Sequence, residues 1–206
     1  MKAGPESIAA ADRIAAAVRV LREGGVIIFP TSGLYGLGAD ALNPAAVKQV
    51  FRIKQRAPDK PLPVLAPDMA AVNRIVRAVT PAAQCLMDAF WPGGLTLVLE
   101  AADGLPEDLT AATGKIGVRI PNHSTAVRIV TAFGGIVTAT SANISGQKGC
   151  RRVDDIDPFL CRSSALVIDG GPLHGRSSTV VDATSDPPAV LREGAIPAAA
   201  ILDALN

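Results

Sequence analysis

Short apolar runs with the character of β-strands alternate with helical segments along most of the chain, and this alternation restricts the fold more than any other feature. Ile14, Val18 and Leu21 recur at helical spacing before a Gly-Gly stop, and the strand-like run VIIF follows at once. Alternating βα units that end in several strands predict an α/β fold with one large mixed sheet, partly antiparallel, flanked by helices. We expect helices at 7–23, from 43 onward, and at 68–79, 81–90, 124–133 and 155–162, strands at 26–29, 63–66, 95–100, 115–120 and 136–140, a polar loop at 101–114, and three final strand-like runs, LVID, STVVD and AVLRE.

The length and composition predict a single domain over residues 1–206. A chain of 206 residues that is 49% hydrophobic and 19% charged can bury one substantial core, and no Gly/Ser linker or charge block divides it. Asp12, Arg13 and Arg19 interrupt the apolar start in a way that a signal peptide does not tolerate. No run approaches the roughly 18 to 20 apolar residues of a membrane span. We therefore expect a cytoplasmic protein with no membrane partner.

The partners that the composition favours are small anions. Aromatic residues make up only 3% of the chain, and proteins that grip single-stranded RNA need aromatic platforms for base stacking. The formal net charge of +1 also argues against a large polyanionic partner, so we expect at most weak direct RNA binding. Cys85, Cys150 and Cys161 show no CxxC pairing and no matching histidine spacing, which predicts neither a metal site nor a disulfide framework.

The first segment with chemical interest, residues 29–41, reads FPTSGLYGLGADA and follows a buried strand. A Gly-rich loop at the end of a strand can place bare backbone N–H groups against an anion. An alternative interpretation takes Gly36, Gly38 and Ala41 as a dinucleotide-binding fingerprint. Its spacing is wrong, because the first of these glycines lies seven residues beyond Phe29 rather than at the end of the strand.

The second segment, KQRAPDK, gathers three cations at the end of the helix that begins near residue 43. Lys54 continues the apolar face formed by Val50 and Phe51, and an ammonium on an inward face needs a reason. One reading is a lysine that snorkels at a helix C-terminus, where the dipole favours cations. The other is that Lys54, with Arg56 and Lys60, forms a clamp for phosphate or carboxylate.

The third segment, KIGVRIPNH, is expected to present Arg119 from the middle of a strand. Alternation along the strand places Lys115, Gly117 and Arg119 on one face, and the apolar residues on the other. A planar guanidinium beside a residue without a side chain could bind a carboxylate with two hydrogen bonds. A solvated strand face would look the same in sequence.

The fourth segment, TATSANISG, spans Thr138–Gly146 and follows the strand-like run IVTAT. Its small hydroxyl and amide side chains could donate hydrogen bonds to phosphate oxygens or to a ribose without adding charge. A polar turn after a strand has the same composition, so the segment by itself does not decide between the two.

Taken in order, the motifs PTSGLYGLG, KQRAPDKPL, WPGGLTLVLE, GVRIPNH, TSANISG, SSTVVD and VLREG resemble the YrdC-like family of threonylcarbamoyl-AMP synthases over residues 20 to 195. The resemblance implies a twisted open α/β sheet with a concave basic cavity. It also implies a nucleotidyltransferase that joins L-threonine, bicarbonate and ATP, with Mg²⁺, into L-threonylcarbamoyladenylate and pyrophosphate. The product would pass to the tRNA threonylcarbamoyl-transfer machinery.

The resemblance further implies roles for individual residues, without any side-chain nucleophile. Catalysis would come from positioning and electrostatics, which agrees with the absence of a Ser-His-Asp or Cys-His pattern in the sequence. The implied catalytic residues are Lys54 and Arg56. The implied ATP-binding residues are Arg56, Lys60, Ser141, Asn143 and Arg192, and the implied L-threonine-binding residues are Thr31, Arg119 and Ser178.

The chain departs from the family pattern in two places. Gly33 stands where the pattern has a second threonine, and GQKGCRR follows the fourth motif. The chain also ends soon after VLREG, as in the short, single-domain form of the family. Two alternatives therefore stay beside the main expectation: a divergent family member that adenylates or carbamoylates another substrate, and a non-catalytic RNA-binding or ribosome-assembly module.

Overall fold

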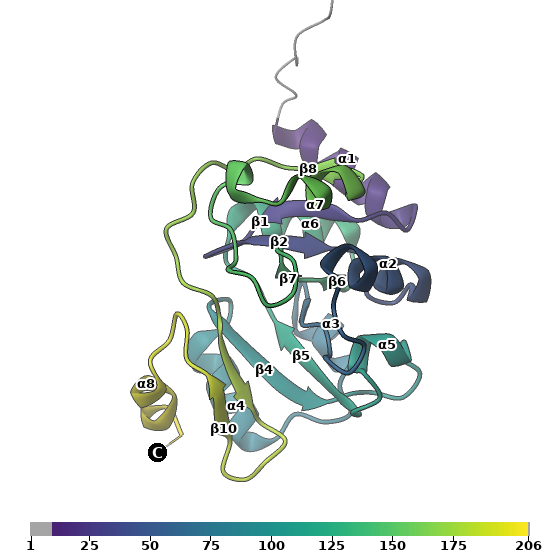
Figure 1. Cartoon of the computed structure of the whole chain (residues 1–206). Helices are drawn as coiled ribbons and strands as arrows, with labels where there is room; N and C mark the ends of the chain where they lie inside the picture. Colours follow the sequence, from purple (N-terminus) through teal and green to yellow (C-terminus); the bar gives the residue numbers. More distant parts are fainter. Residues whose placement is uncertain (1–9, 206) are drawn as a thin grey trace, which may run out of the picture.

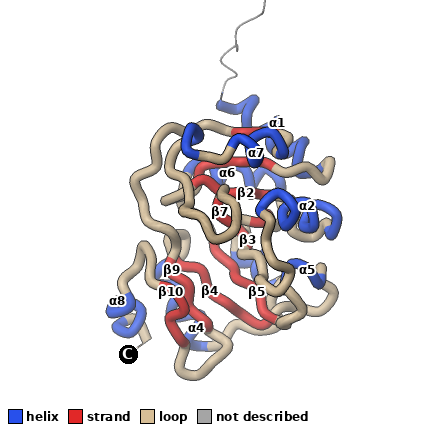
Figure 2. The backbone as a smooth tube through the Cα atoms, viewed as in Figure 1, coloured by secondary structure: helices blue, strands red, loops and turns tan. Residues whose placement is uncertain are grey.

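The structure is a computed structural model that describes residues 10–205. It confirms the α/β class, with mixed sheets flanked by helices (Figures 1 and 2). The strands divide into two sheets, however, where the sequence predicted one. Residues 7–9 of the first expected helix lie outside the described residues.

The first sheet is mixed and has the order β7-β2-β1-β8. The two central strands form an antiparallel hairpin, while β8 joins the other side of β1 in parallel. Its strands are β1 (Ile27–Pro30), β2 (Tyr35–Gly38), β7 (Thr140–Ser141) and β8 (Leu166–Val167).

The second sheet is larger and has the order β10-β9-β4-β5-β3-β6. Antiparallel and parallel pairings alternate across it, as expected for a mixed sheet assembled from crossovers and hairpins. Its strands are β3 (Val64–Leu65), β4 (Leu95–Glu100), β5 (Lys115–Arg119), β6 (Val137–Thr138), β9 (Thr179–Asp182) and β10 (Ala189–Arg192).

The run IVTAT connects the two sheets, and this explains why one sheet was expected. The structure breaks the run at Ala139: β6 pairs with β3 in the second sheet, and β7 pairs with β2 in the first. The Ala139 N–H donates to the carbonyl of Pro63 at 2.8 Å, so the chain stays hydrogen-bonded as it changes sheets. A break of one residue leaves no signal in a short apolar run.

Two helices cover the outer face of the first sheet and pack against each other (Figure 1). They are α1 (Ala10–Arg22) and α6 (Ser124–Phe133), and their apolar faces bury Ile14, Leu21 and Ile129 against Ile27 and Phe29 of β1. The helical spacing read from the sequence therefore predicted the buried face of α1 correctly.

The remaining helices surround the second sheet and a larger core cluster. Asn43 caps α2 as expected, because its side chain accepts from the N–H groups of Ala45 and Ala46 and Pro44 fills the first turn. The polar loop expected at 101–114 contains a short helix, and the helix expected at 68–79 is shorter. The elements are α2 (Pro44–Lys54), α3 (Met69–Asn73), α4 (Pro81–Phe90), α5 (Glu107–Thr110), η1 (Val153–Asp155), α7 (Pro158–Ser163) and α8 (Ala198–Asp203). None of the helices described in residues 10–205 is long and apolar enough to cross a membrane.

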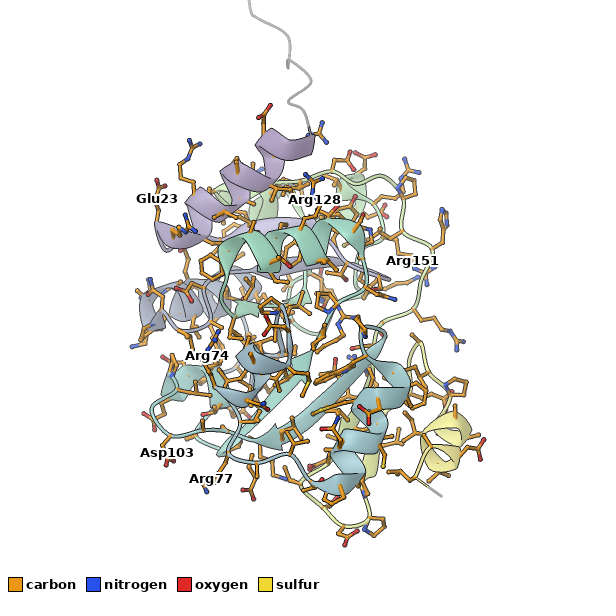
Figure 3. The ribbon with its side chains drawn as sticks, turned by 180° about the vertical axis from the view of Figure 1, so that it is seen from behind. Glu23, Arg74, Arg77, Asp103, Arg128 and Arg151 are labelled. Carbon is orange, nitrogen blue, oxygen red and sulfur yellow. The ribbon has the colours of Figure 1, made fainter. Side chains whose placement is uncertain are left out.

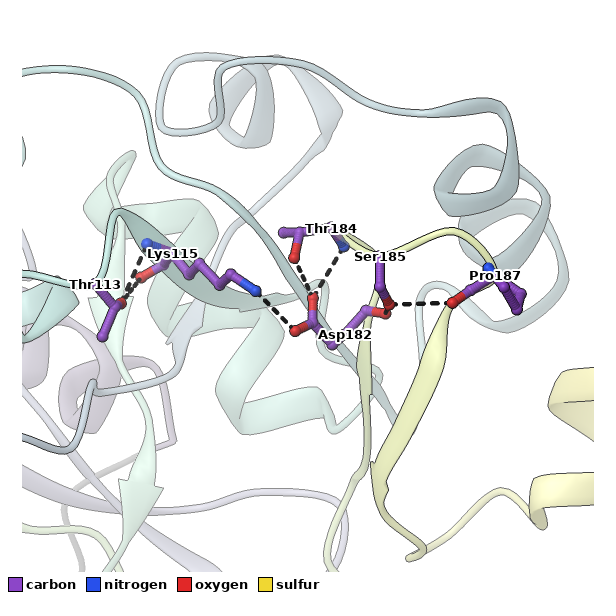
Figure 4. A network of polar contacts seen from close by, with 6 residues as sticks. All are labelled: Thr113, Lys115, Asp182, Thr184, Ser185 and Pro187. Carbon is purple, nitrogen blue, oxygen red and sulfur yellow. Dashed lines mark hydrogen bonds and ion pairs between the residues drawn. The ribbon is translucent and has the colours of Figure 1, made fainter.

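One ion pair fastens the face of the second sheet that includes Arg119. Lys115 of β5 contacts the carboxylate of Asp182 in β9 at 2.9 Å, across the intervening strand β4 (Figure 4). Burial of the Asp182 carboxyl is outweighed by hydrogen bonds from Thr184 and Lys115, which lower the pKa of that carboxyl below its ordinary value. The cation at the start of β5 is thus neutralised within the protein.

Candidate active site

A cavity of about 210 Å³ lies where the two sheets meet. Strands of both sheets line it, because β2 and β7 contribute from the first sheet and β3, β4 and β5 from the second. Its charge is one-sided: among the described residues that line it, there are four arginines and no carboxylate. The arginines are Arg56, Arg119, Arg176 and Arg192.

Arg119 is the most deeply placed of these cations. It ends β5 opposite Leu65 of β3, and only 8% of the residue is exposed. Within residues 10–205 its guanidinium has no hydrogen-bond or ion-pair partner, whereas Lys115 on the same strand is paired with Asp182. Burial, and then the neighbouring Arg192, lower the pKa of Arg119 to about 10. The group stays charged at neutral pH, and a buried charge without a partner favours the binding of an anion.

Two hydroxyl side chains lie in the cavity wall with Arg119. Thr31 is buried, and its Oγ1 donates to the carbonyl of Leu34 at 2.7 Å, which fixes the turn between β1 and β2. Ser178 accepts a hydrogen bond from the Thr96 hydroxyl at 2.9 Å. The structure therefore brings together the three residues that the sequence indicated for the amino acid.

Arg56 and Arg192 line the cavity with their guanidinium groups held by the protein's own backbone. Arg56 donates from Nε to the carbonyl of Lys60 at 3.0 Å and from Nη2 to the carbonyl of Pro61 at 2.9 Å. Arg192 donates from Nη2 to the carbonyl of Ser178 at 2.8 Å. The side chain of Lys60 is exposed and outside the cavity lining, and its carbonyl holds Arg56.

Lys54 is only 2% exposed and does not line the cavity. Its ammonium donates to the carbonyls of Ser141 and Asn143, at 2.5 and 2.8 Å, and lies 3.5 Å from the Asn143 side-chain oxygen. Burial, and then the charge of Arg56, lower the pKa of Lys54 to about 8. The inward orientation of Lys54 predicted from the sequence is therefore confirmed, and its ammonium binds the end of β7 and the segment that follows it.

Asn143 shapes the same segment. Its side-chain oxygen accepts from the Ser141 hydroxyl, and its amide nitrogen donates to the carbonyls of Ile144 and Gln147, both at 2.8 Å. Ser141 lines the cavity, but Asn143 does not. The structure thus divides the SANISG motif into one side chain that faces the cavity and one that holds the turn behind it.

Gly36 and Gly38 have a different role from the one expected. They lie in the buried strand β2, which pairs with β1 and β7, and not in the loop that was expected, although Gly36 lines the cavity. A Cβ at Gly38 would stand 2.6 Å from the ring of Phe29. Gly38 makes room for that ring, which packs in the same apolar cluster as α6, whereas a Cβ at Gly36 would stand 3.6 Å from the ring, an ordinary contact distance.

The described residues contain no cluster of three or more side chains of the kinds that hold metals. The four arginines make the cavity suited to an anion.

Comparison with known proteins gives a consistent answer. The model of the Sua5/YciO/YrdC family, described as telomere recombination, matches residues 19–194. The chain belongs to the Sua5/YciO/YrdC family. This confirms the resemblance that the motifs indicated.

Relatives within the Sua5/YciO/YrdC family agree in sequence and in fold. The chain is 37% identical over 186 residues to the threonylcarbamoyl-AMP synthase of Bacillus subtilis strain 168, covering 89% of this chain and 54% of that protein. A structure of P. abyssi Sua5 complexed with L-threonine matches with a TM-score of 0.89 and 33% identity, covering 98% and 59% of the two chains. For E. coli YciO the TM-score is 0.80 and the identity 30%, with 88% of each covered. This chain spans about half the length of the B. subtilis relative.

One cation that lines this cavity, Arg176, was not predicted from the sequence. Arg176 lines the cavity from the loop before β9, and nothing in the run DGGPLHGR separates it from an ordinary surface arginine. A second threonine at Gly33, which the family pattern led us to expect, has no room, because a Cβ there would stand 1.9 Å from the carbonyl oxygen of Arg176. Gly33, which departs from the family pattern, was the one sign of this arrangement in the sequence, because a glycine there allows the two backbones to approach closely.

Proposed function

We propose that the protein is a threonylcarbamoyl-AMP synthase, which forms L-threonylcarbamoyladenylate and pyrophosphate from L-threonine, bicarbonate and ATP. The observation that carries the proposal is the buried Arg119 guanidinium, which has no partner among residues 10–205 and lies beside two hydroxyl side chains in a cavity without carboxylates. The name of the B. subtilis relative and the L-threonine complex of P. abyssi Sua5 agree with it.

At the amino-acid end, Arg119 binds the α-carboxylate of L-threonine. A planar guanidinium matches a carboxylate with two parallel hydrogen bonds, and the buried position strengthens that pair because little water competes. Thr31 and Ser178 offer hydroxyl groups on the same wall to the remaining polar atoms of the amino acid. The carboxylate is thereby fixed while the amine stays free to react.

At the nucleotide end, Arg56 and Arg192 face the phosphates, with Ser141 as a neutral donor. Lys54 and Asn143 act from behind, by holding the backbone that presents Ser141, and Lys60 by holding Arg56 through its carbonyl. Mg²⁺ enters as part of the MgATP substrate, bound by the phosphates, because no cluster of metal ligands occurs in the described part of the chain.

The reaction needs no side-chain nucleophile. The threonine amine and bicarbonate form a carbamate with loss of water, and a carbamate oxygen attacks the α-phosphorus. The bond from that phosphorus to the bridging oxygen of pyrophosphate breaks. The arginines stabilise the charge that develops on the leaving pyrophosphate, and positioning supplies the rest of the rate enhancement.

The product is a mixed anhydride that reacts readily with water, so it must be consumed quickly. We assign this use to the tRNA threonylcarbamoyl-transfer machinery of the cytoplasm, as the partner of the proposed enzyme. Direct contact with tRNA is expected to be weak, because stacking platforms are scarce. A tight tRNA complex with a steep dependence on salt, in the absence of other proteins, would favour an RNA-binding module instead.

The proposal is tested by incubating the protein with L-threonine, labelled bicarbonate and MgATP, and by detecting pyrophosphate and a labelled adenylate. We expect both products to form together and to require L-threonine. Reactions without threonine, and with L-serine in its place, are the controls. Absence of pyrophosphate at every threonine concentration would contradict the proposal. A larger yield with L-serine would point to another substrate for the same chemistry.

A further inference from the structure

We propose that Arg176 is a further substrate-binding residue, held at the mouth of the cavity by a backbone contact between two glycine-containing loops. Its guanidinium binds an oxyanion, which is either the carboxylate or carbamate of the amino acid or a phosphate of the nucleotide. The assignment of these sources rests on the proposed function.

The two loops are packed backbone against backbone. A Cβ at Gly33 would stand 1.9 Å from the carbonyl oxygen of Arg176, and a Cβ at Gly175 would stand 2.2 Å from the carbonyl oxygen of Ser32. Neither glycine has a φ in the left-handed region, so the requirement is for space and not for an unusual backbone conformation. A side chain on either loop would push the other away.

Hydrogen bonds hold both loops from outside this contact. The Ser32 hydroxyl donates to the Asn122 side chain, which joins the first loop to the end of β5. The carbonyl of Ser177 accepts from the N–H of Ala195 at 2.8 Å, which joins the second loop to the segment after β10. The backbone at Arg176 is therefore fixed before any ligand arrives, so only the side chain has to be ordered when a ligand binds.

The four cavity arginines differ in what their guanidinium groups touch. Those of Arg56 and Arg192 donate to backbone carbonyls. Those of Arg119 and Arg176 have no hydrogen-bond or ion-pair partner within residues 10–205. Arg119 is buried at the floor of the cavity, and Arg176 is exposed at its mouth. Both groups are free to donate to an anion in the cavity, since no carboxylate in the lining competes for them.

The position of Arg176 also indicates which end of the site it serves. Gly33 lies two residues after Thr31, and Arg176 lies two residues before Ser178, so the glycine contact joins the two segments that supply hydroxyl groups for the amino acid. Where the family pattern has a second threonine, this chain has Gly33, and the space is filled by the backbone of Arg176. We expect the amino acid to be the more sensitive ligand.

The test is isothermal titration calorimetry of the wild type, Arg176→Ala and Arg176→Lys with three separate probes: L-threonine, ATP and inorganic pyrophosphate. We expect Arg176→Ala to bind L-threonine about fivefold more weakly, the size of one solvent-accessible charged contact. A loss in the ATP arm instead assigns the oxyanion to the nucleotide. Arg176→Lys keeps the charge, so its affinity for the affected ligand should lie between those of the wild type and Arg176→Ala. The matched control is Arg151→Ala, an exposed arginine at the edge of the molecule and outside the cavity (Figure 3), which should bind as the wild type does.

A second variant tests the contact that places Arg176. Gly33→Ala should weaken the same ligand as Arg176→Ala, because the displaced loop no longer presents the cation at the cavity. If Arg176→Ala binds all three probes as tightly as the wild type, the inference is wrong while the proposed function stands. If the wild type forms no adenylate but Arg176→Ala still weakens pyrophosphate binding, the inference stands and the proposed function fails. A wild type that binds none of the probes overturns both.

Discussion

Lys54 and Arg119 are both buried cations near the junction of the two sheets, and they differ in what surrounds the charged group. Lys54 donates to two backbone carbonyls and approaches a side-chain amide oxygen, from the last residue of β7 and the segment after it. Arg119 has no partner among the described residues and faces a cavity. Burial lowers the pKa of both groups, to about 8 and about 10.

We expect this difference to distinguish a cation that stabilises the fold from one that binds a ligand. A buried charge whose hydrogen bonds are satisfied by the protein contributes to the order of that region, and its removal leaves buried carbonyls without donors. A buried charge with no partner lowers the stability of the free protein and gains its partner only when an anionic ligand binds. The family resemblance implies a functional role for each residue, but the two environments predict opposite consequences of mutation.

The largest expected effect is on ligand binding by Arg119→Met, which removes the charge and keeps an unbranched side chain. Loss of a buried, charged, two-point contact should weaken L-threonine binding about 100-fold, or about 3 kcal/mol. Calorimetric titration with L-threonine measures this. Arg151→Ala, which removes a positive charge outside the cavity, is the control and should bind L-threonine as the wild type does. An unchanged threonine affinity in Arg119→Met would mean that this cation is not the carboxylate site.

A smaller effect is expected in the pH dependence of stability. The pKa of Lys54 is about 8 in the folded protein and near 10.5 in the unfolded chain. Between those values the unfolded chain holds more protons at this residue, so the contribution of Lys54 to stability rises with pH. Its slope is at most about 1.4 kcal/mol per pH unit. Urea unfolding of the wild type and Lys54→Met at pH 8, 9 and 10 measures it. The free energy of unfolding of the wild type minus that of Lys54→Met should increase as the pH rises. A difference that stays constant or decreases would contradict the burial of the ammonium.

Much of the fold could be predicted from periodicity, because the helices bury regular apolar faces. The face of α1 and the Asn43 cap of α2 both followed from local patterns. The division into two sheets could not, because it depends on a break at Ala139 where each side finds a different partner strand. The choice of partner depends on residues far away in the chain, and a short run of apolar residues does not record it.

The site was predictable in its members and less so in their roles. Arg119, Thr31 and Ser178 do line one cavity, as the motifs indicated. The inward phase of Lys54 was also visible, but a sequence does not tell whether an inward ammonium meets a ligand or a backbone carbonyl. Arg176 was missed because its placement depends on a contact between two loops, and Gly33 was the trace that this contact left in the sequence.

The most direct test of the difference between the two cations is the free energy of unfolding of Lys54→Met and Arg119→Met, measured by urea denaturation at pH 7 without ligand. We expect Lys54→Met to lose about 2 kcal/mol, because the Asn143 carbonyl loses its donor and the Ser141 carbonyl keeps only the N–H of Asn143. Arg119→Met should be as stable as the wild type or more stable by roughly 1 kcal/mol, because an unpaired buried charge is removed. An Arg119→Met variant that is destabilised as much as Lys54→Met would contradict the account.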